Sequence, residues 1–532
     1  MKFALSSLDI GIIAVSIVLT VLVGLWAGRK QDKTARGYFL ASGRLPWYII
    51  GAAFVSTSVS SEQIVGTIGA AYTHGMGVAN WEWFTVPHYT IFMLFFVPMY
   101  LRNRITTVPE FLKRRYGPLC GDIYSWVMLF AYVFIFLAPV LYGGSLAFSS
   151  LTGIDFRLVL WMMIVLIGLY ATKGGLASVM WTDAVQCLML VGGGVLLFWL
   201  AVHKIPGGWH AMVQADPRRF HLYHAADDKI APFLGLLTFA FSGGLFYQAG
   251  NQVMLQRILG ARSRWDGMMG VTFAGFINLL RPLVTCFLGF VVFYWVYRMH
   301  AAPPLENQDL TFPFALEHLA PGWGLRGIIL AGFLAAVMST VSALANSTAT
   351  IFSLDLYHRF MNRKADDQQL VKVGRGASLV ALVLAAFVAP SVEHLGGIFQ
   401  YFQTGITYLS TPFSSVIILG LIWKRTNYQG AIFGLLGGIV IQTAVVVVLS
   451  AMGIHLHWFY NAFIAELLII TGVVIVSLLT PAPEEAQWKP FLWSRRMLTE
   501  YDDGVMRPWY HSWVPWFLVY AGIWAYLYWL YW

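Results

Sequence analysis

The chain has 532 residues, of which 58% are hydrophobic and only 11% are charged, and its formal net charge is +9. A soluble domain carries about 25% charged residues and always exposes a large wet surface, so this composition excludes a soluble globular protein. The basic excess fits the cytoplasmic loops of a membrane protein better than a nucleic-acid-binding surface.

The beginning of the chain predicts a membrane helix that is retained. The first apolar run, Ile10 to Ala27, is followed by Gly28-Arg29-Lys30 and not by a small-residue cleavage site. Three scattered cysteines have no metal-ligand spacing and are expected to be buried apolar residues. They are Cys120, Cys187 and Cys286.

About twenty apolar residues span a bilayer, and the chain contains fourteen such candidate segments. We therefore predict an all-α polytopic membrane protein with about fourteen transmembrane helices and no separate soluble domain. The breaks near 172–181 and around 392 are the shortest. The candidate spans lie near 9–28, 47–71, 81–101, 122–151, 157–172, 182–203, 231–250, 268–298, 325–352, 374–391, 393–422, 430–450, 457–479 and 512–531.

Basic residues alternate between the predicted loops. The loops that follow odd-numbered spans hold 25 of the 34 Lys and Arg residues, whereas Arg281 falls inside a span. The positive-inside rule places the basic loops in the cytoplasm and both termini outside. The residues assigned to these loops include Lys30 and Lys33 after the first span, Arg115 after the third, Lys173 after the fifth and Arg257 after the seventh.

The second span is interrupted halfway by the polar run Ser56-Thr57-Ser58-Val59-Ser60-Ser61-Glu62-Gln63. Polar groups are costly inside a bilayer, so such a run marks a functional segment. An unwound helix here would expose backbone carbonyls to a cation. The alternative is that the serines bond back to carbonyls one turn earlier and pack tightly against a neighbouring helix.

The seventh span contains Ser242-Gly243-Gly244, followed by Tyr247-Gln248-Ala249-Gly250-Asn251-Gln252. The glycines favour a second broken helix, and glycine-mediated helix packing is the alternative. This segment lies five spans after the first interruption. Interrupted helices at matching positions of two five-helix halves are typical of inverted-repeat transporters, whose binding site lies near the membrane midplane.

The ninth span places Ser339, Ser342 and Asn346 on one helical face, at spacings of three and four residues. Hard oxygen donors suit a small hard cation. Packing of small residues between helices is the alternative.

Four single polar residues each allow two interpretations. Glu82, at the start of the third span, accepts hydrogen bonds from a ligand or lies at the interface near a helix N-terminus. Asp183, expected at the cytoplasmic start of the sixth span, is a capping acid or a cation relay. Arg281 pairs with a buried acid or meets an anionic group, and Gln403 bonds a ligand or a neighbouring helix.

Nothing in the sequence indicates an enzyme. The histidines lie mostly in loops without metal-ligand spacing, and the glycine triplet 192–194 lies inside a span with no P-loop lysine. The many Trp and Tyr residues of the last span are most simply an aromatic belt at the membrane interface.

Several ordered motifs resemble the sodium/solute symporter family, most closely its sodium–glucose (sodium–galactose) cotransporter branch. The resemblance runs from the first span to about residue 430. It rests on Ser61-Glu62-Gln63 with Glu82-Trp83, Thr107-Val108-Pro109-Glu110-Phe111, Gly174-Gly175-Leu176 through Trp181-Thr182-Asp183 to Gln186, Asn251-Gln252 to Gln256-Arg257, Asn346-Ser347-Thr348-Ala349-Thr350-Ile351-Phe352, and Phe399-Gln400-Tyr401-Phe402-Gln403.

The resemblance implies a leucine-transporter-like fold with a 5+5 inverted-repeat core. The first repeat would cover 47–203 and the second 231–422, with peripheral helices at 9–28 and 430–531. It also implies alternating access in the cell (inner) membrane, driven by a sodium gradient.

Carried over by position, the resemblance implies one sodium site and suggests part of another. The first site would use the carbonyls of Ser56, Val59 and Ala336 and the hydroxyls of Ser339 and Thr340. Some family members bind a second sodium, and the matching residues here are Ser58, Ser339, Ser342 and Asp183. A further serine of that second site is Ala343 in this chain, so one ligand is missing.

For a sugar, the resemblance places Gln63, Glu82, Thr85 and Gln403 around the hydroxyls. Tyr247 would be the inner aromatic gate that stacks on the pyranose face. Three positions depart from the family: its asparagine in the second span is Ser58, an asparagine in the seventh is Gly244, and a lysine in the eighth is Asn278. Ser58 and Asn278 stay candidate substrate contacts.

The sequence therefore predicts a sodium-coupled symporter that imports a small polar solute, with a sugar or polyol favoured. Its partners would be the solute, Na+ and the lipid bilayer, with no nucleic acid. A symporter for an organic anion, an amino acid or another solute is the alternative, although Glu82 would repel an anion unless it is protonated or paired with Arg281. A sensor or channel built on the transporter fold is the third hypothesis.

Overall fold

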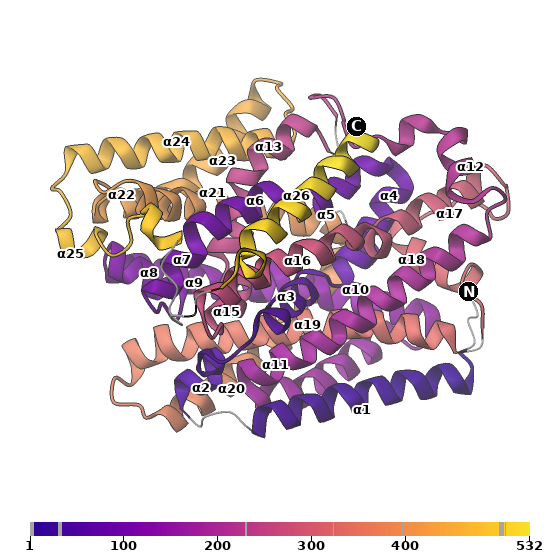
Figure 1. Cartoon of the computed structure of the whole chain (residues 1–532), viewed down its shortest axis with the longest axis horizontal. Coiled ribbons are helices and arrows are strands. Elements are labelled where there is room, and N and C mark those ends of the chain that lie inside the picture. Colours follow the sequence, from indigo (N-terminus) through magenta and orange to yellow (C-terminus); the bar gives the residue numbers. More distant parts are fainter. Residues whose placement is uncertain are drawn as a thin grey trace.

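The computed structural model describes residues 5–29, 34–228, 231–322, 324–395, 397–498, 505 and 507–532, and every regular element in these ranges is helical. Figure 1 shows long helices lying along the long axis of the molecule, with α1 (Ser7–Arg29) at one edge and α24 (Trp458–Leu479) at the opposite edge. The predicted all-α class is confirmed. Lys30 and Lys33, which we assigned to the first basic loop, lie outside the described residues.

The remaining α-helices follow in chain order. They are α2 (Ala35–Leu40), α3 (Trp47–Ser58), α4 (Ile68–His74), α5 (Asn80–Trp83), α6 (Thr85–Ile91), α7 (Val97–Arg102), α8 (Val108–Arg115), α9 (Pro118–Ala131), α10 (Ala138–Thr152), α11 (Phe156–His203), α12 (Gly208–Ala215), α13 (Phe233–Phe241), α14 (Gly243–Leu245), α15 (Gln252–Leu259), α16 (Arg264–Thr285), α17 (Phe287–Tyr297), α18 (Thr311–His318), α19 (Leu325–Thr350), α20 (Asp367–Val388), α21 (Gly397–Ile422), α22 (Tyr428–Ile432), α23 (Gly438–Ala451), α25 (Glu485–Trp488) and α26 (Trp513–Leu530).

Short π-helical segments join several of these helices into longer rods. They are Glu62–Thr67, Phe92–Phe96, Tyr132–Leu137, Phe246–Gly250, Ile351–Met361 and Phe433–Gly437. Short 3-10 segments lie at Ala41–Gly43, Met76–Ala79, Pro217–Phe220, Gln308–Leu310, Ala389–Leu395, Arg495–Leu498 and Trp509–His511.

Ten helical stretches in the described ranges are long and apolar enough to cross a membrane, and the bent pair formed by α13 and Gly243–Gly250 brings the number to eleven. Two shorter apolar helices, α3 and Phe156–Gly168, add to them. Helices lie at all fourteen predicted segments, including α26. The number of crossings itself stays a prediction, because length and composition alone do not place every short helix across the bilayer.

The two shortest predicted breaks both interrupt helical structure. The break near 172–181 falls at Gly175, whose φ of 59° kinks α11 and is a conformation that glycine adopts without steric cost. The side chain of Lys173, assigned to that loop, lies outside the described residues. The break around 392 is the 3-10 segment Ala389–Leu395 between α20 and α21.

Burial separates central helices from peripheral ones. In the most apolar window of α19 and its π-helical continuation, 94% of residues are buried inside the protein, against 17% for α1, 28% for the α22–α23 rod and 33% for α24. Helix α11 contacts α3, α16 and α19, and α3 also contacts α16 and α19. A helix with a buried polar face, such as α19, therefore turns that face toward other helices and not toward lipid.

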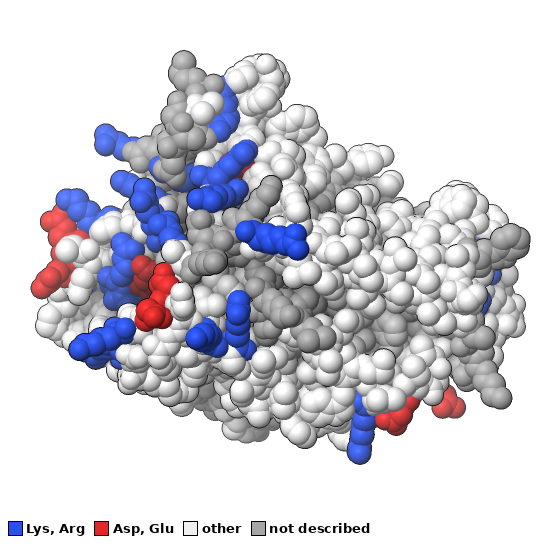
Figure 2. Space-filling view, turned by 90° about the horizontal axis from the view of Figure 1, so that it is seen from below, with Lys and Arg blue, Asp and Glu red and all other residues white. Residues whose placement is uncertain are grey.

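Basic side chains collect at one end of the molecule (Figure 2). In Figure 1 both marked termini lie toward the opposite end of the long axis. Arg115, which we counted in the basic loop after the third span, lies at the end of α8 and not on the surface. Its guanidinium is fully buried and donates to the carbonyls of Gly420, Trp423 and Thr426 at 2.9–3.1 Å.

Candidate functional site

The predicted interruption of the second span is confirmed. Helix α3 ends at Ser58 because Val59 takes an extended conformation (φ −117°, ψ 118°), and helical structure resumes as the π-helical segment Glu62–Thr67. The last carbonyls of a helix have no partner within it, so this break leaves backbone oxygens available. The alternative, in which the serines bond back to carbonyls one turn earlier, also holds for one residue. Ser58 Oγ donates to the carbonyl of Val55 at 2.9 Å.

The predicted interruption of the seventh span is confirmed too. Helix α13 meets Gly243–Gly250 at Ser242, whose backbone leaves the helical region (φ −99°, ψ −94°), and the two pieces are bent by 48°. Asn251 is extended, and its side chain accepts a hydrogen bond from the backbone N–H of Val253, which caps α15. The two broken helices therefore occur at the two places where polar and glycine-rich runs interrupt the apolar pattern.

A small cavity of about 90 Å³ is lined by residues of both broken helices, of α5 and α6, of α16 and of α21. It collects six of the seven residues that the family resemblance assigns to substrate or gate. These six are Ser58, Gln63, Glu82, Thr85, Tyr247 and Gln403. The seventh, Asn278, does not line the cavity; it lies behind it, where its amide donates to Tyr89 Oη at 2.7 Å.

The cavity wall contains a buried ion pair. Arg281 Nη2 lies 2.5 Å from Glu82 Oε2, and both side chains are almost completely buried. The same guanidinium donates to Ser58 Oγ and Ser58 O at 3.3 Å and to Asn278 Oδ1 at 3.2 Å. Of the two interpretations of Arg281, pairing with a buried acid is the observed one. Glu82 accordingly lies inside the bundle and not at the membrane interface.

The last helix packs behind this wall, a contact that we did not predict from the sequence. Tyr520 of α26 is fully buried, and its hydroxyl lies 2.6 Å from Thr85 Oγ1. Trp524 Nε1 donates to the carbonyl of Trp83 at 2.6 Å. An aromatic belt describes only part of α26, namely exposed residues such as Trp529.

A second buried ion pair lies beside the broken end of α3. Arg257 Nη2 is 3.4 Å from Asp183 Oδ2, and Arg257 Nε donates to Thr57 Oγ1 at 3.0 Å. Both charged side chains have no solvent exposure. Asp183 also accepts a hydrogen bond from Ser339 Oγ at 2.7 Å.

This pair corrects two assignments. Arg257 was counted in a cytoplasmic loop, but it belongs to α15 and is fully buried. Asp183 was placed at the start of a helix, but it lies inside the stretch Gly175–His203, so it is not a capping acid. A buried acid in an apolar span calls for a cation nearby, but the sequence does not show which arginine meets Asp183.

The residues predicted to bind sodium come from α3 and α19, which contact each other. Thr340 Oγ1 lies 3.1 Å from the carbonyl oxygen of Thr57 and 3.5 Å from that of Val59. Ser342 Oγ donates to the carbonyl of Ser339 at 2.9 Å. All members of the two predicted sodium sets are buried: Ser56, Ser58, Val59, Asp183, Ala336, Ser339, Thr340 and Ser342.

Metal binding by acidic, His or Cys clusters is not found, because no group of three such residues close enough to share an ion occurs in the described ranges.

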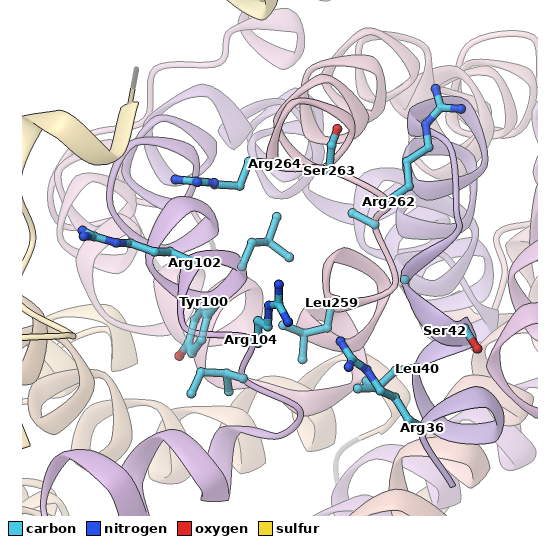
Figure 3. A pocket seen from close by; sticks show the side chains of 14 residues that line it. Arg36, Leu40, Ser42, Tyr100, Arg102, Arg104, Leu259, Arg262, Ser263 and Arg264 are labelled. Atoms are coloured by element: carbon cyan, nitrogen blue, oxygen red, sulfur yellow. The ribbon is translucent and has the colours of Figure 1, made fainter. Parts of the chain in front are cut away.

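A larger cavity of about 460 Å³ lies at the basic end and was not predicted as a site. Figure 3 shows Arg36 and Arg104 directed into the same space, with Arg102 and Arg264 on another side of it. Its described lining holds five arginines and no acidic residue. Arg262, also of this lining, donates to Asp266 Oδ2 at 2.7 Å. This charge is of the kind expected of a cytoplasmic face.

Comparisons with known proteins agree with this architecture. The model of the "Sodium:solute symporter family" matches residues 38–438. The sodium/glucose cotransporter of Vibrio parahaemolyticus is 32% identical over 82% of this chain and 85% of its own length. The sodium/mannose cotransporter of Bos taurus is 31% identical over 92% of this chain and 89% of its own length.

A solved structure of a Na+-coupled sialic acid symporter superposes on 90% of this chain and 99% of its own with a TM-score of 0.79, at 22% identity. That likeness confirms the leucine-transporter-like fold. The named relatives are cotransporters and not enzymes. Since the family model covers most of the chain and close relatives align along most of their length, this chain belongs to the sodium:solute symporter family, whose members move a solute together with sodium.

Proposed function

We propose that this symporter imports a neutral polyhydroxylated solute, a sugar or polyol, and that the 90 Å³ cavity is its binding site. The observation that carries the proposal is the charge balance of the lining. Its only charged groups among the described residues are Arg281 and Glu82, which neutralise each other in an ion pair of 2.5 Å. The other polar groups of the lining are hydroxyls, amides, one imidazole and one indole N–H.

The lining suits hydroxyl groups. Gln63, Thr85 and Gln403 offer amide and hydroxyl groups that both donate and accept hydrogen bonds, as several sugar hydroxyls require. Tyr247 supplies a flat apolar surface in the same cavity, where it would act as the inner gate. Ligand pockets usually enclose about 300–1,000 Å³, so the walls must move apart to admit a hexose, as alternating access requires.

The alternative of an anionic solute is less well supported. Arg281 is the only cation of the cavity lining in the described residues, and it is already bonded to Glu82, Ser58 and Asn278. A second acid, Glu62, is buried nearby and hydrogen-bonded to Ser60. An incoming carboxylate would have to displace Glu82 from its partner and would then face two buried acids.

The relatives that support a sugar are those named for glucose and mannose, at 32% and 31% identity. The likeness to the sialic acid symporter carries only the fold at 22% identity, so it does not favour an acidic sugar.

We further propose one coupling sodium at the break of α3. Its ligands would be the carbonyls of Ser56, Val59 and Ala336 and the hydroxyls of Ser339 and Thr340. The break releases the carbonyls, and Thr340 Oγ1 already lies within 3.1–3.5 Å of two carbonyl oxygens beside it.

A second sodium is not part of the proposal. Of the residues that would bind it, Asp183 is already paired with Arg257. Ala343 offers no hydroxyl at the position of a further ligand.

We also propose the organisation of the chain in the cell membrane. Two repeats, 47–203 and 231–422, each begin with a broken helix, α3 and α13 respectively. The helices at 9–28 and 430–531 are peripheral, in line with the low burial of α1, α23 and α24. The basic end would face the cytoplasm, so that both termini, which lie toward the other end, are outside (Figures 1 and 2).

The test is uptake into proteoliposomes under an inward sodium gradient. D-glucose, D-galactose, D-mannose and myo-inositol are the neutral solutes, and sialic acid and lactate are the anions. We expect uptake of at least one neutral solute with sodium outside and none with potassium outside. Uptake confined to an anion, or uptake that is equal in sodium and potassium, contradicts the proposal.

A further inference from the structure

We propose that His88 is a substrate-binding residue and that, with Gln248, it forms a subsite for one hydroxyl of the solute. The inference rests on the proposed function, because it names a contact in the same cavity. Neither residue was among the candidates that the sequence suggested. His88 lies on α6 and Gln248 on the π-helical segment Phe246–Gly250, and both line the cavity.

The first observation is unused hydrogen-bonding capacity. His88 and Gln248 are each only 7% exposed. Both ring nitrogens of His88 and the Oε1 atom of Gln248 are buried and have no hydrogen-bond partner in the described part of the chain. Leaving a buried polar atom unsatisfied costs about 1–3 kcal/mol, so three such atoms around one cavity indicate a missing partner.

The second observation is the match to a hydroxyl. A neutral imidazole offers one N–H donor and one acceptor nitrogen, and an amide oxygen accepts. A sugar hydroxyl both donates and accepts. His88 follows Thr85 by three residues on α6, so one helix face presents both side chains to the cavity. Thr85 and His88 would therefore contact neighbouring parts of one solute.

The third observation is the space beside the ring. A Cβ atom at Gly244 would lie 2.5 Å from His88 Nδ1, closer than real Cβ atoms approach, and 3.1 Å from Cε1, which is a tight contact. Gly244 does not have a positive φ, so its backbone does not require glycine. The missing side chain at 244 is explained by the imidazole that occupies its place. This pairing holds the ring against the seventh span, at the wall that also carries Gln248.

The transport test uses deoxy analogues and the variants His88→Ala and His88→Gln. Uptake of D-glucose or D-galactose, whichever the wild type carries, is compared with that of its 2-, 3- and 6-deoxy analogues. We expect His88→Ala to raise KM for the parent sugar roughly 2- to 12-fold, as the loss of one neutral hydrogen bond predicts. One deoxy analogue should show no such rise, because the hydroxyl that His88 binds is already absent. His88→Gln should recover part of the affinity.

Two outcomes of that test overturn the proposal. A rise in KM by the same factor for every analogue assigns His88 a structural role. An unchanged KM for all sugars shows that ordered water alone satisfies the ring. If the wild type carries none of the neutral solutes, the proposed function fails, and the hydroxyl subsite fails with it.

The close packing of His88 against Gly244 is tested without any solute, by thermal unfolding in detergent. Gly244→Ala should lower Tm, and the double variant Gly244→Ala with His88→Ala should recover most of that loss. Gly192→Ala is the matched control, since a Cβ there meets nothing within 4 Å. A double variant that is no more stable than Gly244→Ala contradicts the placement of the imidazole against Gly244, whatever the protein transports.

Discussion

Arg281 and Glu82 form an ion pair of 2.5 Å inside the helical bundle, with side-chain exposures of 8% and 1%. Taking two charges out of water is costly, and their attraction compensates only when further hydrogen bonds satisfy the remaining donors. Here Ser58 and Asn278 accept hydrogen bonds from the two terminal nitrogens of Arg281. Arg281 thus links α16 to α5 through Glu82 and to the broken end of α3 through Ser58, and the pair leaves the cavity without net charge.

Removing one partner of this pair should be strongly destabilising. Glu82→Gln leaves Arg281 buried and unpaired, and we expect a loss of about 3–5 kcal/mol in unfolding free energy. The double variant Glu82→Gln with Arg281→Met should recover much of it, because no buried charge remains. Thermal unfolding in detergent measures both. Lys489→Met is the control, since its pair with Glu485 is exposed and should matter little.

The result that would contradict this account is a double variant no more stable than Glu82→Gln. In that case the loss would come from the carboxylate's own contacts and not from the uncompensated guanidinium. Transport is expected to fail in both variants, because Glu82 also lines the cavity.

Thr340→Ala should raise the sodium concentration that gives half-maximal uptake, without lowering the amount of folded protein. Its hydroxyl lies beside the carbonyls of Thr57 and Val59, where the proposed ion would bind. Thr348→Ala is the matched control, because this buried hydroxyl of the same helix bonds the carbonyl of Leu344 at 2.8 Å, one turn earlier. Equal sodium dependence of the two variants would remove Thr340 from the site.

The ratio of sodium to solute should be one. Asp183 is bonded to Arg257 and Ser339, so it has no reason to hold a second ion, and Ala343 lacks the hydroxyl that such an ion would need. The reversal potential of sodium-driven uptake in proteoliposomes, measured at several solute gradients, gives this ratio directly. A value of two would show that the Asp183–Arg257 pair opens during transport.

Much of the site could be predicted from sequence, because polarity inside an apolar span is a strong signal. The run around Ser58 and the glycines after Ser242 mark the two helix breaks beside the cavity. The family resemblance then named Gln63, Thr85 and Gln403, which line the cavity.

The remaining features depend on tertiary packing that no local pattern reports. Arg257 follows an apolar span as a loop arginine would, and only the position of Asp183 in the folded bundle shows that it is buried. Asn278 and Arg281 lie one turn apart on α16, and the longer side chain is the one that reaches the cavity. Tyr520 lies in an aromatic-rich helix, which on composition alone favours an interfacial belt.

Tyr520→Phe should weaken solute binding although this helix lies far along the chain from the other site residues. The substitution removes the hydroxyl that lies 2.6 Å from Thr85 Oγ1 and keeps the ring. A typical hydrogen bond contributes about 0.5–1.5 kcal/mol, so KM for the transported sugar should rise by roughly 2- to 12-fold. Tyr526→Phe is the control, because this ring is 57% exposed. Equal KM values for the two variants would show that the hydrogen bond between Tyr520 and Thr85 does not contribute to solute binding.

The orientation of the chain can be tested with single cysteines. The three native cysteines are buried, so they should react little with a membrane-impermeant maleimide. In intact cells we expect labelling of Ser7→Cys and of a cysteine added after Trp532, and no labelling of Lys364→Cys until the cells are opened. Ser7 and Lys364 are both exposed in the structure. The positive-inside rule acts on the whole set of loops. The opposite labelling pattern at all three positions would therefore show that the chain has the inverted orientation. If only one terminus is labelled, the number of crossings is odd and the count of fourteen is wrong.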